Sequence, residues 1–446
     1  MAASYDAIVV GAGPAGEHAL GRLQKLGLRS ALVERELVGG ECAYWACIPS
    51  KTLLRAPEVR FEARRAAGVD EPEQSWRDLA EYRDYMIRNL DDSKQVEGYR
   101  DDGVDVHRGE ASIAGRGRVV VGDETLETDR IVVATGSSAR VPDIPGLDEA
   151  GYWTNREATT LAEVPASVVV LGGGPVGVEL GQFMRRFGAE VTIVEKHDRL
   201  LAREDSAVGD LIGQTLAEEG IELRLGTQVE QVTGDGAART VHLGGGEEVR
   251  AQELLVAIGR EPRIPEGLEA LGVGTSAKGI AVDDRCRAAE GVWAVGDVTG
   301  VMPFTHVGKY QARVACADIA GVDARADYGA IPRVVFSDPE VAAVGITAAQ
   351  ARERGIAPLS SRVELAESIS RPWTYERDPR GSLGLVADAE REVLVGAWAV
   401  APLAGEWIHY AALAIKTETP LAVLRDTVAQ FPTFTEGYLT ALEELG

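Results

Sequence analysis

Cysteine, histidine and methionine are scarce in this chain: its 446 residues include four Cys, six His and four Met. So few thiols and imidazoles argue against a metal-rich protein and against a small disulfide-stapled scaffold. Basic residues are also few, 46 against 70 acidic residues, and the net charge of −24 disfavours binding to nucleic acid or to an anionic membrane. No apolar run approaches the roughly 18 residues that a membrane-spanning helix needs.

We expect no targeting signal at the N-terminus. Residues 1–6 lead straight into a β-branched strand, without the basic segment and cleavage site of a secretory leader. We therefore expect a soluble, cytoplasmic protein with neither nucleic acid nor membrane as a partner. A composition of 45% hydrophobic and 26% charged residues is that of a globular chain, and the length allows about three domains.

The first 35 residues carry the pattern of a dinucleotide-binding unit. An apolar strand over residues 7–10 runs into the loop GAGPAG at 11–16, a helix follows, and a second strand ends on Glu34. Glycines in such a loop allow a tight turn, close approach of the backbone to a pyrophosphate, and packing of the helix on the strand; here they are Gly11, Gly13 and Gly16. Glu34 is placed to accept hydrogen bonds from a ribose 2′-hydroxyl, while the helix N-terminus faces the phosphates.

The same pattern recurs in the middle of the chain. A strand over 168–171 is followed by the loop GGGPVG at 172–177 and by a second strand that ends on Glu195. The first glycine and the acid are 23 residues apart in both copies. The matching glycines are Gly172, Gly174 and Gly177. Two such units predict two bound adenine dinucleotides with electrons passing between them; the alternative is one structural cofactor and one relic site.

Other apolar segments support this organisation. Residues 131–136 and 254–259 are expected strands that end in glycine after each nucleotide loop, and a third strand ends at Asp297, which could bond a sugar-like hydroxyl chain. The acid-rich stretch 75–98 is expected to form one helix with a solvated face. Domain boundaries are expected near residues 141–146, 279 and 327.

Two of the four cysteines, Cys42 and Cys47, are five residues apart in GGECAYWACIPSK, residues 39–51. In a cytosolic protein this spacing indicates redox or metal chemistry, and metal is disfavoured because no second Cys or His pair accompanies it. We expect the two thiols within one helical turn, able to close a disulfide, with Lys51 lowering the pKa of a neighbouring thiol. Cys286 and Cys316 stand alone and suit a buried core.

With these motifs the sequence resembles the pyridine nucleotide–disulfide oxidoreductases, the flavoproteins that include lipoamide dehydrogenase, glutathione reductase and mercuric reductase. The cysteine segment follows that group's pattern GGTCxNxGCxPSK, and the resemblance extends over essentially the whole chain. It includes ATG at 134–136, AVGD at 294–297, and IPRVVFSDPEV at 331–341.

The resemblance implies an α/β fold with two Rossmann-like dinucleotide-binding domains and a C-terminal α+β dimerisation domain. The domains would be residues 1–150 with 280–326 for FAD, 151–279 for NAD(P), and 327–446 for the dimer interface. FAD would be held by Gly11, Gly13, Gly16, Glu34, Arg35, Lys51, Ala111, Thr135, Gly136 and Asp297. The nicotinamide dinucleotide would lie on Gly172, Gly174, Gly177, Glu195 and Gly259.

The resemblance also implies a relay. Hydride passes from the nicotinamide to the flavin, and the flavin reduces a Cys42–Cys47 disulfide through Cys47, leaving Cys42 to attack the substrate. Lys51 and Glu179 match an ion pair near the flavin, and the lysine should favour the reduced flavin and the Cys47 thiolate. A homodimer is expected in which Glu436 completes the partner's site.

The C-terminal segment departs from the family pattern. The family carries a proton-transfer histidine in an HPTLSE-like segment, but here that segment is FPTFTE, with Phe431 at the histidine position and Glu436 retained. General acid–base help of this kind contributes roughly 10²–10⁴-fold. We therefore expect poor turnover of lipoamide or glutathione and a raised Cys42 pKa, through desolvation and the missing cation. Tyr438 is a candidate replacement proton donor.

Other positions beside these motifs also bear on the site. Glu41 replaces a threonine near the flavin phosphates, which places a carboxylate close to an anion. Tyr44 and Trp45 are either core packing or an aromatic platform that selects the acceptor. His306 belongs to a family-like segment near the flavin, and His409 is expected to pack in an interface helix. No terminal cysteine pair is present to hand over mercuric ion.

Cofactor preference is mixed. Glu195 should bond a 2′-hydroxyl and repel a 2′-phosphate, which favours NADH. The basic residues that follow could instead bind that phosphate and accept NADPH; they are Lys196, His197 and Arg199.

Three functional hypotheses remain open. The first is an NAD(P)H-oxidising reductase that passes electrons through the Cys42–Cys47 pair to a small disulfide or related small-molecule acceptor. The second is transfer from flavin or dithiol to a quinone, dye, oxygen or metal ion. The third is a lipoamide dehydrogenase-like subunit or scaffold within a larger complex. The family's fold carries several chemistries, so the acceptor itself is not determined.

Overall fold

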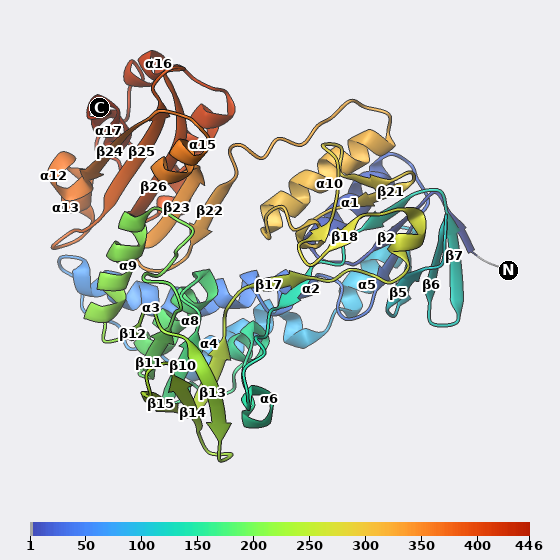
Figure 1. Ribbon diagram of the computed structural model, residues 1–446, viewed down its shortest axis with the longest axis horizontal. Coiled ribbons are helices and arrows are strands. Elements are labelled where there is room, and N and C mark those ends of the chain that lie inside the picture. Colours follow the sequence, from blue (N-terminus) through green and yellow to red (C-terminus); the bar gives the residue numbers. More distant parts are fainter. Residues whose placement is uncertain (1–2) are drawn as a thin grey trace. The chain divides into compact units, whose positions relative to one another are not determined.

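The computed structural model describes residues 3–446, which divide into two compact units (Figure 1). Unit 1 comprises the residues up to Ser50 together with 81–140 and 259–327. Unit 2 comprises 51–80, 141–258 and 328–446. The three predicted domain ranges stay a prediction.

Unit 1 is built on a six-stranded sheet whose central strand, β2 (Ala7–Val10), pairs in parallel with β3 and β8. The strand order is β20 (Arg287–Ala289), β21 (Val292–Ala294), β8 (Ile131–Val133), β2, β3 (Ser30–Glu34), β4 (Asp105–Arg108). Central strands of this kind are buried on both faces, which explains their continuous apolar runs. One face packs against α1 (Pro14–Lys25) and α10 (Thr305–Ile319), which lie side by side in Figure 1.

The other face of this sheet packs against a smaller one. Its order is β1 (Ala3–Tyr5), β7 (Glu124–Thr128), β6 (Arg118–Val121), β5 (Ala111–Ile113). Short pairs complete unit 1: β9 (Ser137–Ala139) with β17 (Arg260–Pro262), and β18 (Thr275–Ser276) with β19 (Gly279–Ile280). Short 3₁₀ turns are η2 (Leu268–Leu271) and η3 (Asp297–Thr299).

The stretch expected as one helix over 75–98 is two helices, so that expectation was wrong. The elements are α4 (Trp76–Met86), the 3₁₀ turn η1 (Arg88–Leu90) and α5 (Ser93–Asp101). All three residues of η1 are left-handed, with φ of 55°, 51° and 58°. A left-handed run costs roughly 1–2 kcal/mol per residue and stops a right-handed helix.

The first half of unit 2 repeats the strand–loop–helix plan. Its parallel sheet has the order β12 (Glu222–Arg224), β11 (Glu190–Val194), β10 (Ser167–Leu171), β16 (Glu253–Val256). The helices are α6 (Leu147–Ala150), α7 (Asn155–Thr159), α8 (Pro175–Arg186) and α9 (Ser206–Glu218). An antiparallel sheet follows, of β13 (Val229–Gly234), β14 (Arg239–Leu243) and β15 (Glu248–Ala251). Unit 2 also holds most of α3 (Cys47–Arg65).

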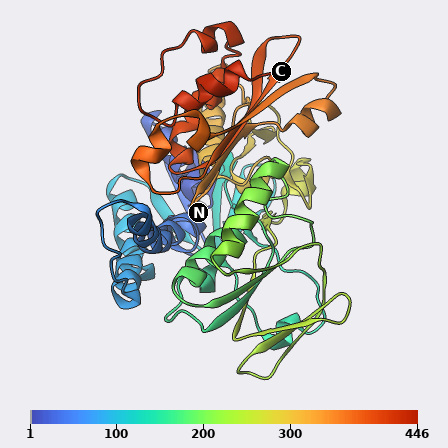
Figure 2. The same cartoon turned by 90° about the vertical axis from the view of Figure 1, so that its left-hand side faces the viewer.

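The second half of unit 2 is α+β, as expected for residues 327–446. Its antiparallel sheet has the order β22 (Pro332–Val335), β23 (Glu340–Gly345), β26 (Val393–Ala401), β25 (Ser382–Asp388), β24 (Pro358–Glu364). Helices cover one face, the red segments of Figure 2. They are α14 (Ala404–Trp407), α15 (His409–Lys416), α16 (Leu421–Arg425) and α17 (Glu436–Glu443). Short helices α11 (Ala348–Glu353), α12 (Leu365–Ser368) and α13 (Arg371–Tyr375) join the strands.

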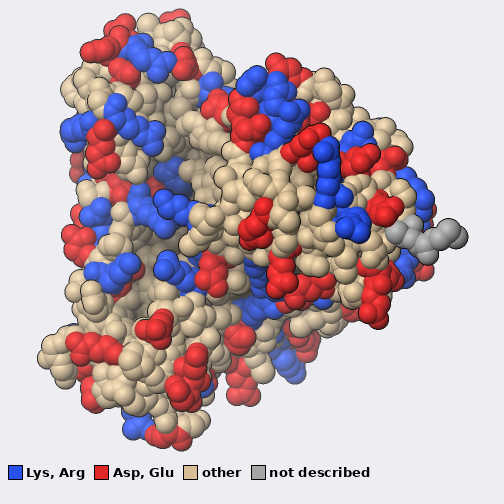
Figure 3. Space-filling view, turned by 45° about the vertical axis from the view of Figure 1, so that its right-hand side comes forward, with Lys and Arg blue, Asp and Glu red and all other residues tan. Residues whose placement is uncertain are grey.

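The surface follows from the composition. Acidic and basic side chains are interspersed over the face in Figure 3, which suits a charged globular chain. Among residues 3–446, no helix combines the length and apolarity that crossing a membrane would require.

Candidate functional site

The first glycine-rich loop is shaped by close backbone approaches. Gly11 has φ +102°, and a Cβ there would lie 2.4 Å from the carbonyl oxygen of Ala134. A Cβ on Gly16 would lie 1.9 Å from the carbonyl oxygen of Gly11. Only glycine fits these two positions, because any side chain would push the helix away from the strand. Gly13 has open space where a Cβ would stand, so its backbone can be approached from outside.

The acid that ends β3 is held by this loop. One carboxylate oxygen of Glu34 accepts a hydrogen bond from the backbone N–H of Ala12 at 2.7 Å, and the other accepts from the N–H of Glu36 at 2.7 Å. The carboxylate is therefore fixed at the end of the strand beside the loop. That is the position from which an acid can bond a ribose hydroxyl.

The second loop repeats this geometry in unit 2. A Cβ on Gly172 would lie 2.5 Å from the carbonyl oxygen of Ala257, and one on Gly177 would lie 2.0 Å from the carbonyl oxygen of Gly172. Glu195 accepts from the backbone N–H of Gly173 at 2.7 Å and from that of His197 at 2.8 Å. The match in backbone contacts shows that both loops fold by the same local rule.

Both loops lead into a helix N-terminus suited to a phosphate. The helices α1 and α8 each have 12 residues, proline in the first turn and an extended glycine before it, Gly13 or Gly174. Neither of these N-termini receives a side-chain hydrogen bond, so the first N–H groups point outward. Such termini bind pyrophosphate through backbone N–H groups and the helix dipole. The residues present therefore fit an adenine dinucleotide in each unit.

The other predicted flavin contacts take varied positions in unit 1. Gly136 has φ +71°, and the hydroxyl of Thr135 donates to the carbonyl oxygen of Arg263. Asp297 accepts a hydrogen bond from the Ser137 hydroxyl at 2.6 Å. Ala111 is buried in β5, and the Arg35 guanidinium forms an ion pair with the Glu110 carboxylate at 3.3 Å. Gly259, predicted for the nicotinamide dinucleotide, has φ +123° and falls in unit 1 rather than with the second loop.

The two motif cysteines lie on different helices, so their expected place within one helical turn was wrong. Cys42 belongs to α2 (Gly40–Tyr44), and Cys47 begins α3. Trp45, with φ −136° and ψ 0°, breaks the helix between them. Among the described residues all four cysteines are thiols, and Cys286 and Cys316 are buried as expected.

Thr305, the first residue of α10, joins the two sulfurs. Its hydroxyl donates to Sγ of Cys42 at 3.4 Å, and the same oxygen lies 3.6 Å from Sγ of Cys47. The thiol pair thus sits at the positive end of a 15-residue helix, which favours a thiolate. From the sequence, this segment was predicted only to lie near the flavin. A hydroxyl residue at the start of a predicted helix was the one signal that could have pointed to Thr305.

The Cys42 thiol is a weaker acid than a free cysteine. A hydrogen bond to Cys47, burial, and the negative charge that Cys47 can carry all raise the pKa of the Cys42 thiol. The Thr305 hydroxyl and the Lys309 charge lower that pKa by smaller amounts. Cys42 therefore holds its proton to a higher pH than a free cysteine would. A raised Cys42 pKa was expected, and its largest cause is the hydrogen bond to the neighbouring sulfur, followed by the expected desolvation.

The predicted ion pair is present in unit 2. The Lys51 ammonium lies 2.7 Å from a carboxylate oxygen of Glu179, whose side chain is almost fully buried. The other carboxylate oxygen accepts from the backbone N–H of Phe336 at 2.9 Å, and the ammonium lies 4.7 Å from the Phe336 ring centroid. Glu179 is thus held by two donors, which fixes the lysine at that point of α3.

Two arginines explain how unit 1 accommodates the unusual Glu41. Its carboxylate lies 3.6 Å from the guanidinium of Arg260 and 3.7 Å from that of Arg263. Arg260 also donates to the Ser137 hydroxyl at 2.7 Å. The negative charge next to Cys42 is therefore balanced within unit 1, which resolves the conflict expected from sequence.

Tyr44 and Trp45, the aromatic residues between the two cysteines, differ in their burial. Tyr44 is fully buried, and its hydroxyl donates to the carbonyl oxygen of Val38 at 3.1 Å. Arg88, from the left-handed turn η1, donates to the Tyr44 hydroxyl at 3.3 Å. Tyr44 is therefore core packing, whereas Trp45 is partly exposed with its ring 5.7 Å from that of Tyr44.

The C-terminal segment has a phenylalanine, Phe431, where the family pattern has a histidine. Phe431 is 72% exposed, and Glu436 at the start of α17 accepts from the backbone N–H of Thr433 at 3.1 Å. Tyr438 is enclosed in unit 2, where its hydroxyl donates to the carbonyl oxygen of Trp407 at 3.4 Å and burial raises its pKa. A tyrosine held this way is a poor proton donor, so the suggested replacement role is not supported.

The two remaining histidine candidates are exposed. His306 stacks on Phe304 at 5.2 Å between ring centroids, and His409 at the start of α15 is exposed rather than packed within unit 2. Among residues 3–446, no group of three His, Cys, Asp or Glu side chains is arranged to hold a metal ion.

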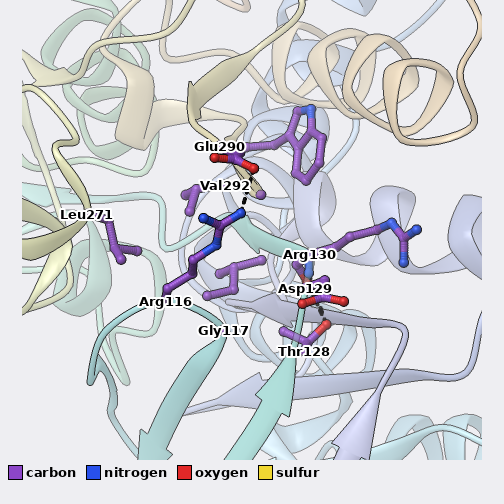
Figure 4. Close-up of a pocket in the computed structure, with 11 residues that line it drawn as sticks. Arg116, Gly117, Thr128, Asp129, Arg130, Leu271, Glu290 and Val292 are labelled. Carbon is purple, nitrogen blue, oxygen red and sulfur yellow. Dashed lines mark hydrogen bonds and ion pairs between the residues drawn. The ribbon is translucent and has the colours of Figure 1, made fainter.

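A separate cavity lies in unit 1 at the amino ends of strands β8 and β21 of the main sheet (Figure 4). Ile131 and Val292, which line it, begin strands whose far ends lead to the glycine-rich loop region. The cavity contains an ion pair between Arg116 and Glu290. None of the predicted site residues lines it, so we do not connect it with the cofactors.

Comparison with known proteins identifies the class of this protein. Residues 5–312 match the family model "Pyridine nucleotide-disulphide oxidoreductase", and residues 331–442 match the dimerisation domain of the same family. The chain therefore belongs to the pyridine nucleotide-disulphide oxidoreductases. The predicted family, fold class and enzyme class are confirmed: it is an NAD(P)H-dependent flavoprotein oxidoreductase of a family that uses FAD and carries a self-association domain.

Individual relatives span several activities. The mercuric reductase of Bacillus cereus is 34% identical over 454 residues, covering 98% of this chain and 71% of that protein. The dihydrolipoyl dehydrogenase of Haloferax volcanii is 33% identical over 465 residues, covering 99% of this chain and 96% of that protein. Among solved structures, the HOCl-induced flavoprotein disulfide reductase RclA of Escherichia coli has 27% identity and a TM-score of 0.88, with 99% and 100% of the chains covered. RclA has also been solved as Cu(II) complexes.

Proposed function

We propose that this protein oxidises NADH and delivers the electrons through Cys42 and Cys47 to a thiophilic acceptor, without a proton-transfer histidine. The observation that carries the proposal is the Thr305 hydroxyl between the two sulfurs at the N-terminus of α10. It stabilises thiolates without supplying a base, while position 431 holds an exposed phenylalanine. We place this activity in the cytoplasm, where reduced nicotinamide dinucleotides are available.

The cofactors divide between the two loops. We propose FAD on the first loop and its neighbours, the residues Gly11, Gly13, Gly16, Glu34, Arg35, Lys51, Ala111, Thr135, Gly136 and Asp297. The nicotinamide dinucleotide would bind Gly172, Gly174, Gly177, Glu195 and Gly259. FAD, when bound, supplies two-electron chemistry between the nicotinamide and the thiol pair. Glu34 and Glu195 would each bond a ribose, being already oriented by two backbone N–H groups.

We assign the two thiols different roles. Cys47 would exchange electrons with the cofactor, while Cys42, whose pKa is raised by its hydrogen bond to Cys47 and by burial, would contact the acceptor. Lys51, held by Glu179, would place its positive charge near the reduced cofactor and favour negative charge there. Glu436 would complete the site of a partner subunit in a homodimer.

A thiophilic metal ion is the acceptor that best suits a site without a histidine. Two thiolates give up one electron each to two Cu(II) ions, the Cys42–Cys47 disulfide forms, and two Cu(I) ions leave. Cys42 loses its proton to solvent before this step, and no leaving thiolate has to be protonated, so the reaction needs no imidazole as an acid. The Cu(II) complexes of RclA and the mercuric reductase relatives support a soft metal ion as substrate.

A disulfide with an acidic leaving thiol is the second candidate, favoured by the family name itself. The Cys42 thiolate attacks one sulfur and forms a mixed disulfide while the first thiolate leaves. The Cys47 thiolate then attacks Cys42, closing the Cys42–Cys47 disulfide and releasing the second thiolate. Low-pKa thiols leave without a proton, so this route also tolerates Phe431.

NADH is the proposed nucleotide. Glu195 presents a carboxylate that accepts a 2′-hydroxyl and repels a 2′-phosphate. Arg199, one of the basic residues that follow Glu195, is turned to Asp198 at 3.4 Å and to the carbonyl oxygen of Ala202 at 3.4 Å. This arrangement leaves less positive charge for a phosphate beside the ribose.

Anaerobic titration with NADH and, separately, NADPH tests the proposal. A long-wavelength thiolate–flavin band at two electrons, lost in Cys47→Ser, would establish the relay. The wild type should then reduce Cu(II), measured as Cu(I) captured by bathocuproine disulfonate, and Cys42→Ser should lose most of that activity while keeping flavin reduction by NADH. Full Cu(II) and disulfide reduction by Cys42→Ser would instead mean that electrons leave directly from the flavin.

A further inference from the structure

Three buried polar side chains of α8 lie along one face of that helix and bind the segment 336–338. They are Glu179, Gln182 and Arg186, which are spaced three and four residues apart, and none is more than 7% exposed. The segment joins β22 to β23, in the part of the chain that matches the dimerisation domain of the family. All of these residues belong to unit 2.

Gln182 pairs with both backbone groups of Asp338. The side-chain oxygen of Gln182 accepts from the backbone N–H of Asp338 at 2.8 Å, and its side-chain nitrogen donates to the carbonyl oxygen of Asp338 at 2.8 Å. The same nitrogen also donates to Glu219 at 2.9 Å. The amide thus binds this backbone as a neighbouring strand would, and it gives both buried groups of Asp338 a partner.

The carboxylate of Asp338 is held as well. Arg186 donates to one of its oxygens at 2.9 Å, and Arg65 of α3 donates to both oxygens at 2.8 and 3.0 Å. Glu219 balances the second cation, since it lies 2.6 Å from the guanidinium of Arg186. Asp338 is therefore fixed through its N–H, its carbonyl oxygen and its carboxylate, which restrains the segment against α8.

The restrained backbone supplies one of the two donors that hold Glu179. The N–H of Phe336 donates to one carboxylate oxygen at 2.9 Å, and the Lys51 ammonium donates to the other at 2.7 Å. The ammonium also lies 4.7 Å from the Phe336 ring centroid. The carboxylate and the ring beside Lys51 thus both depend on where the segment 336–338 lies.

Apolar contacts would bury this segment without any of these hydrogen bonds. Phe183 and Met184 of the same helix pack in that way, within the hydrophobic core of unit 2. Hydrogen bonds add a preferred distance and direction, which apolar packing does not supply. The polar face of α8 therefore determines the position of the backbone, in addition to covering it.

We propose that Gln182 is a positioning residue for Lys51. By fixing Asp338 it sets the direction of the Phe336 N–H. That N–H orients Glu179, which in turn holds the ammonium of the lysine. The inference rests on the proposed function, in which this positive charge favours the reduced cofactor. Gln182 transfers no group or electron and changes only the place of a charge.

The test is the midpoint potential of FAD reduction in the holoenzyme, with Cys42→Ser/Cys47→Ser in every variant so that FAD receives the electrons. Lys51→Gln removes the charge and should disfavour the reduced flavin roughly tenfold, which is about 30 mV for a two-electron couple. Gln182→Met keeps the side-chain volume but loses the hydrogen bonds to Asp338. It should lower the potential in the same direction by roughly threefold in the equilibrium, or about 15 mV.

A double variant separates positioning from a general loss of stability. If Gln182 acts through Lys51, Lys51→Gln/Gln182→Met should have the potential of Lys51→Gln alone, because no charge is left to displace. Phe183→Leu is the matched control, since Phe183 is fully buried next to Gln182 on α8. Its truncation should lower the denaturant midpoint and leave the potential unchanged.

Gln182→Asn gives a second measurement that does not depend on how well the methionine variant folds. It keeps an amide but is one methylene too short to bind both groups of Asp338, so it should also lower the potential. Wild-type potentials in both Gln182 variants, or a double variant in which the two shifts add, would overturn the inference. If Lys51→Gln itself leaves the potential unchanged, the proposed role of Lys51 fails and the inference fails with it, which is a distinguishable result.

Discussion

Thr305 donates a hydrogen bond to Sγ of Cys42 at 3.4 Å, although the two residues are 263 positions apart in sequence. The hydroxyl is positioned by the first turn of α10, so its direction is set by a whole helix rather than by a flexible loop. Cys47 lies 3.6 Å from the same oxygen. One neutral group thus serves both sulfurs, where a family histidine would have served one thiol as a base.

Removing this hydroxyl should make the Cys42 thiol harder to ionise, because the hydroxyl donates to its sulfur. Hydrogen bonds to charged groups contribute about 1.5–3 kcal/mol, so Thr305→Val should raise the apparent pKa of the Cys42 thiol by roughly one unit or more. The measurement is the pH dependence of the alkylation of Cys42 in the two-electron-reduced enzyme. Thr305→Ser keeps the hydroxyl and should behave like the wild type; a Val variant with an unchanged titration would exclude this role.

Substitutions in the two glycine-rich loops should affect different cofactors. A Cβ at Gly16 would lie 1.9 Å from a carbonyl oxygen, so Gly16→Ala should be isolated with little FAD, measured as the flavin-to-protein ratio. A Cβ at Gly177 meets a carbonyl at 2.0 Å, so Gly177→Ala should retain FAD but resist reduction by NADH while dithionite still reduces it.

Gly21→Ala is the matched control for these loop variants. It lies in α1 with nothing within 4 Å of a new Cβ, and it should gain about 0.5–1 kcal/mol of stability with normal flavin content. Full FAD content in Gly16→Ala would contradict the assignment of the first loop to FAD.

Glu195 should decide the nucleotide. Replacing it in Glu195→Ala removes a hydrogen bond from a charged group to the 2′-hydroxyl, which predicts a roughly 10–100-fold rise in KM for NADH. The KM for NADPH should stay the same or fall, because the repulsion of a 2′-phosphate is also removed. Steady-state kinetics with both nucleotides checks this, with the exposed Lys196→Ala as control for NADH. Equal changes for both nucleotides would argue that Glu195 only holds the loop.

Glu340 should make unit 2 less stable as the pH rises. Burial raises the pKa of Glu340 from 4.5 to about 7, assisted by the charges of Glu58, Glu406 and Asp338, while the N–H of Gly405 opposes the rise. Between pH 4.5 and about 7 the unfolded chain releases this proton and the folded chain keeps it, so stability falls across that window. Above about pH 7 the loss of folding free energy is complete, and the difference between the pKa values of 4.5 and about 7 corresponds to roughly 3 kcal/mol.

The check is Glu340→Gln, which keeps an oxygen to accept the hydrogen bond from Gly405. Its denaturant midpoint should match the wild type near pH 4.5 and exceed it at pH 8. If the difference in denaturant midpoint between Glu340→Gln and the wild type is the same at both pH values, Glu340 ionises normally.

Local features were readable from sequence. The glycine spacing and the acid 23 residues later led to two loops whose backbone contacts agree almost bond for bond, with Glu34 and Glu195 each held by two N–H groups. All of these contacts lie within one strand–loop–helix–strand unit, where spacing alone sets the geometry. The Lys51–Glu179 pair was found only through the family resemblance, since 128 residues separate its members.

Other features could not be read from sequence for definite physical reasons. The break between α4 and α5 contains neither glycine nor proline; it is a left-handed turn at Arg88–Leu90, from which Arg88 reaches the buried Tyr44 hydroxyl. Tertiary contacts there outweigh local propensity. The partition of the cysteines between two helices likewise follows from the backbone at Trp45.

The sequence by itself determined the dinucleotide loops, the redox cysteine pair, the family and the absence of a histidine at position 431, because each is a matter of residue type at a fixed spacing. Only the tertiary structure decided what surrounds the thiols: Thr305 between the sulfurs and the arginines that balance Glu41. Hydrogen bonds and fields act through space over a few ångströms, and segments hundreds of residues apart share that space only after the sheet has formed and the helices have packed on it.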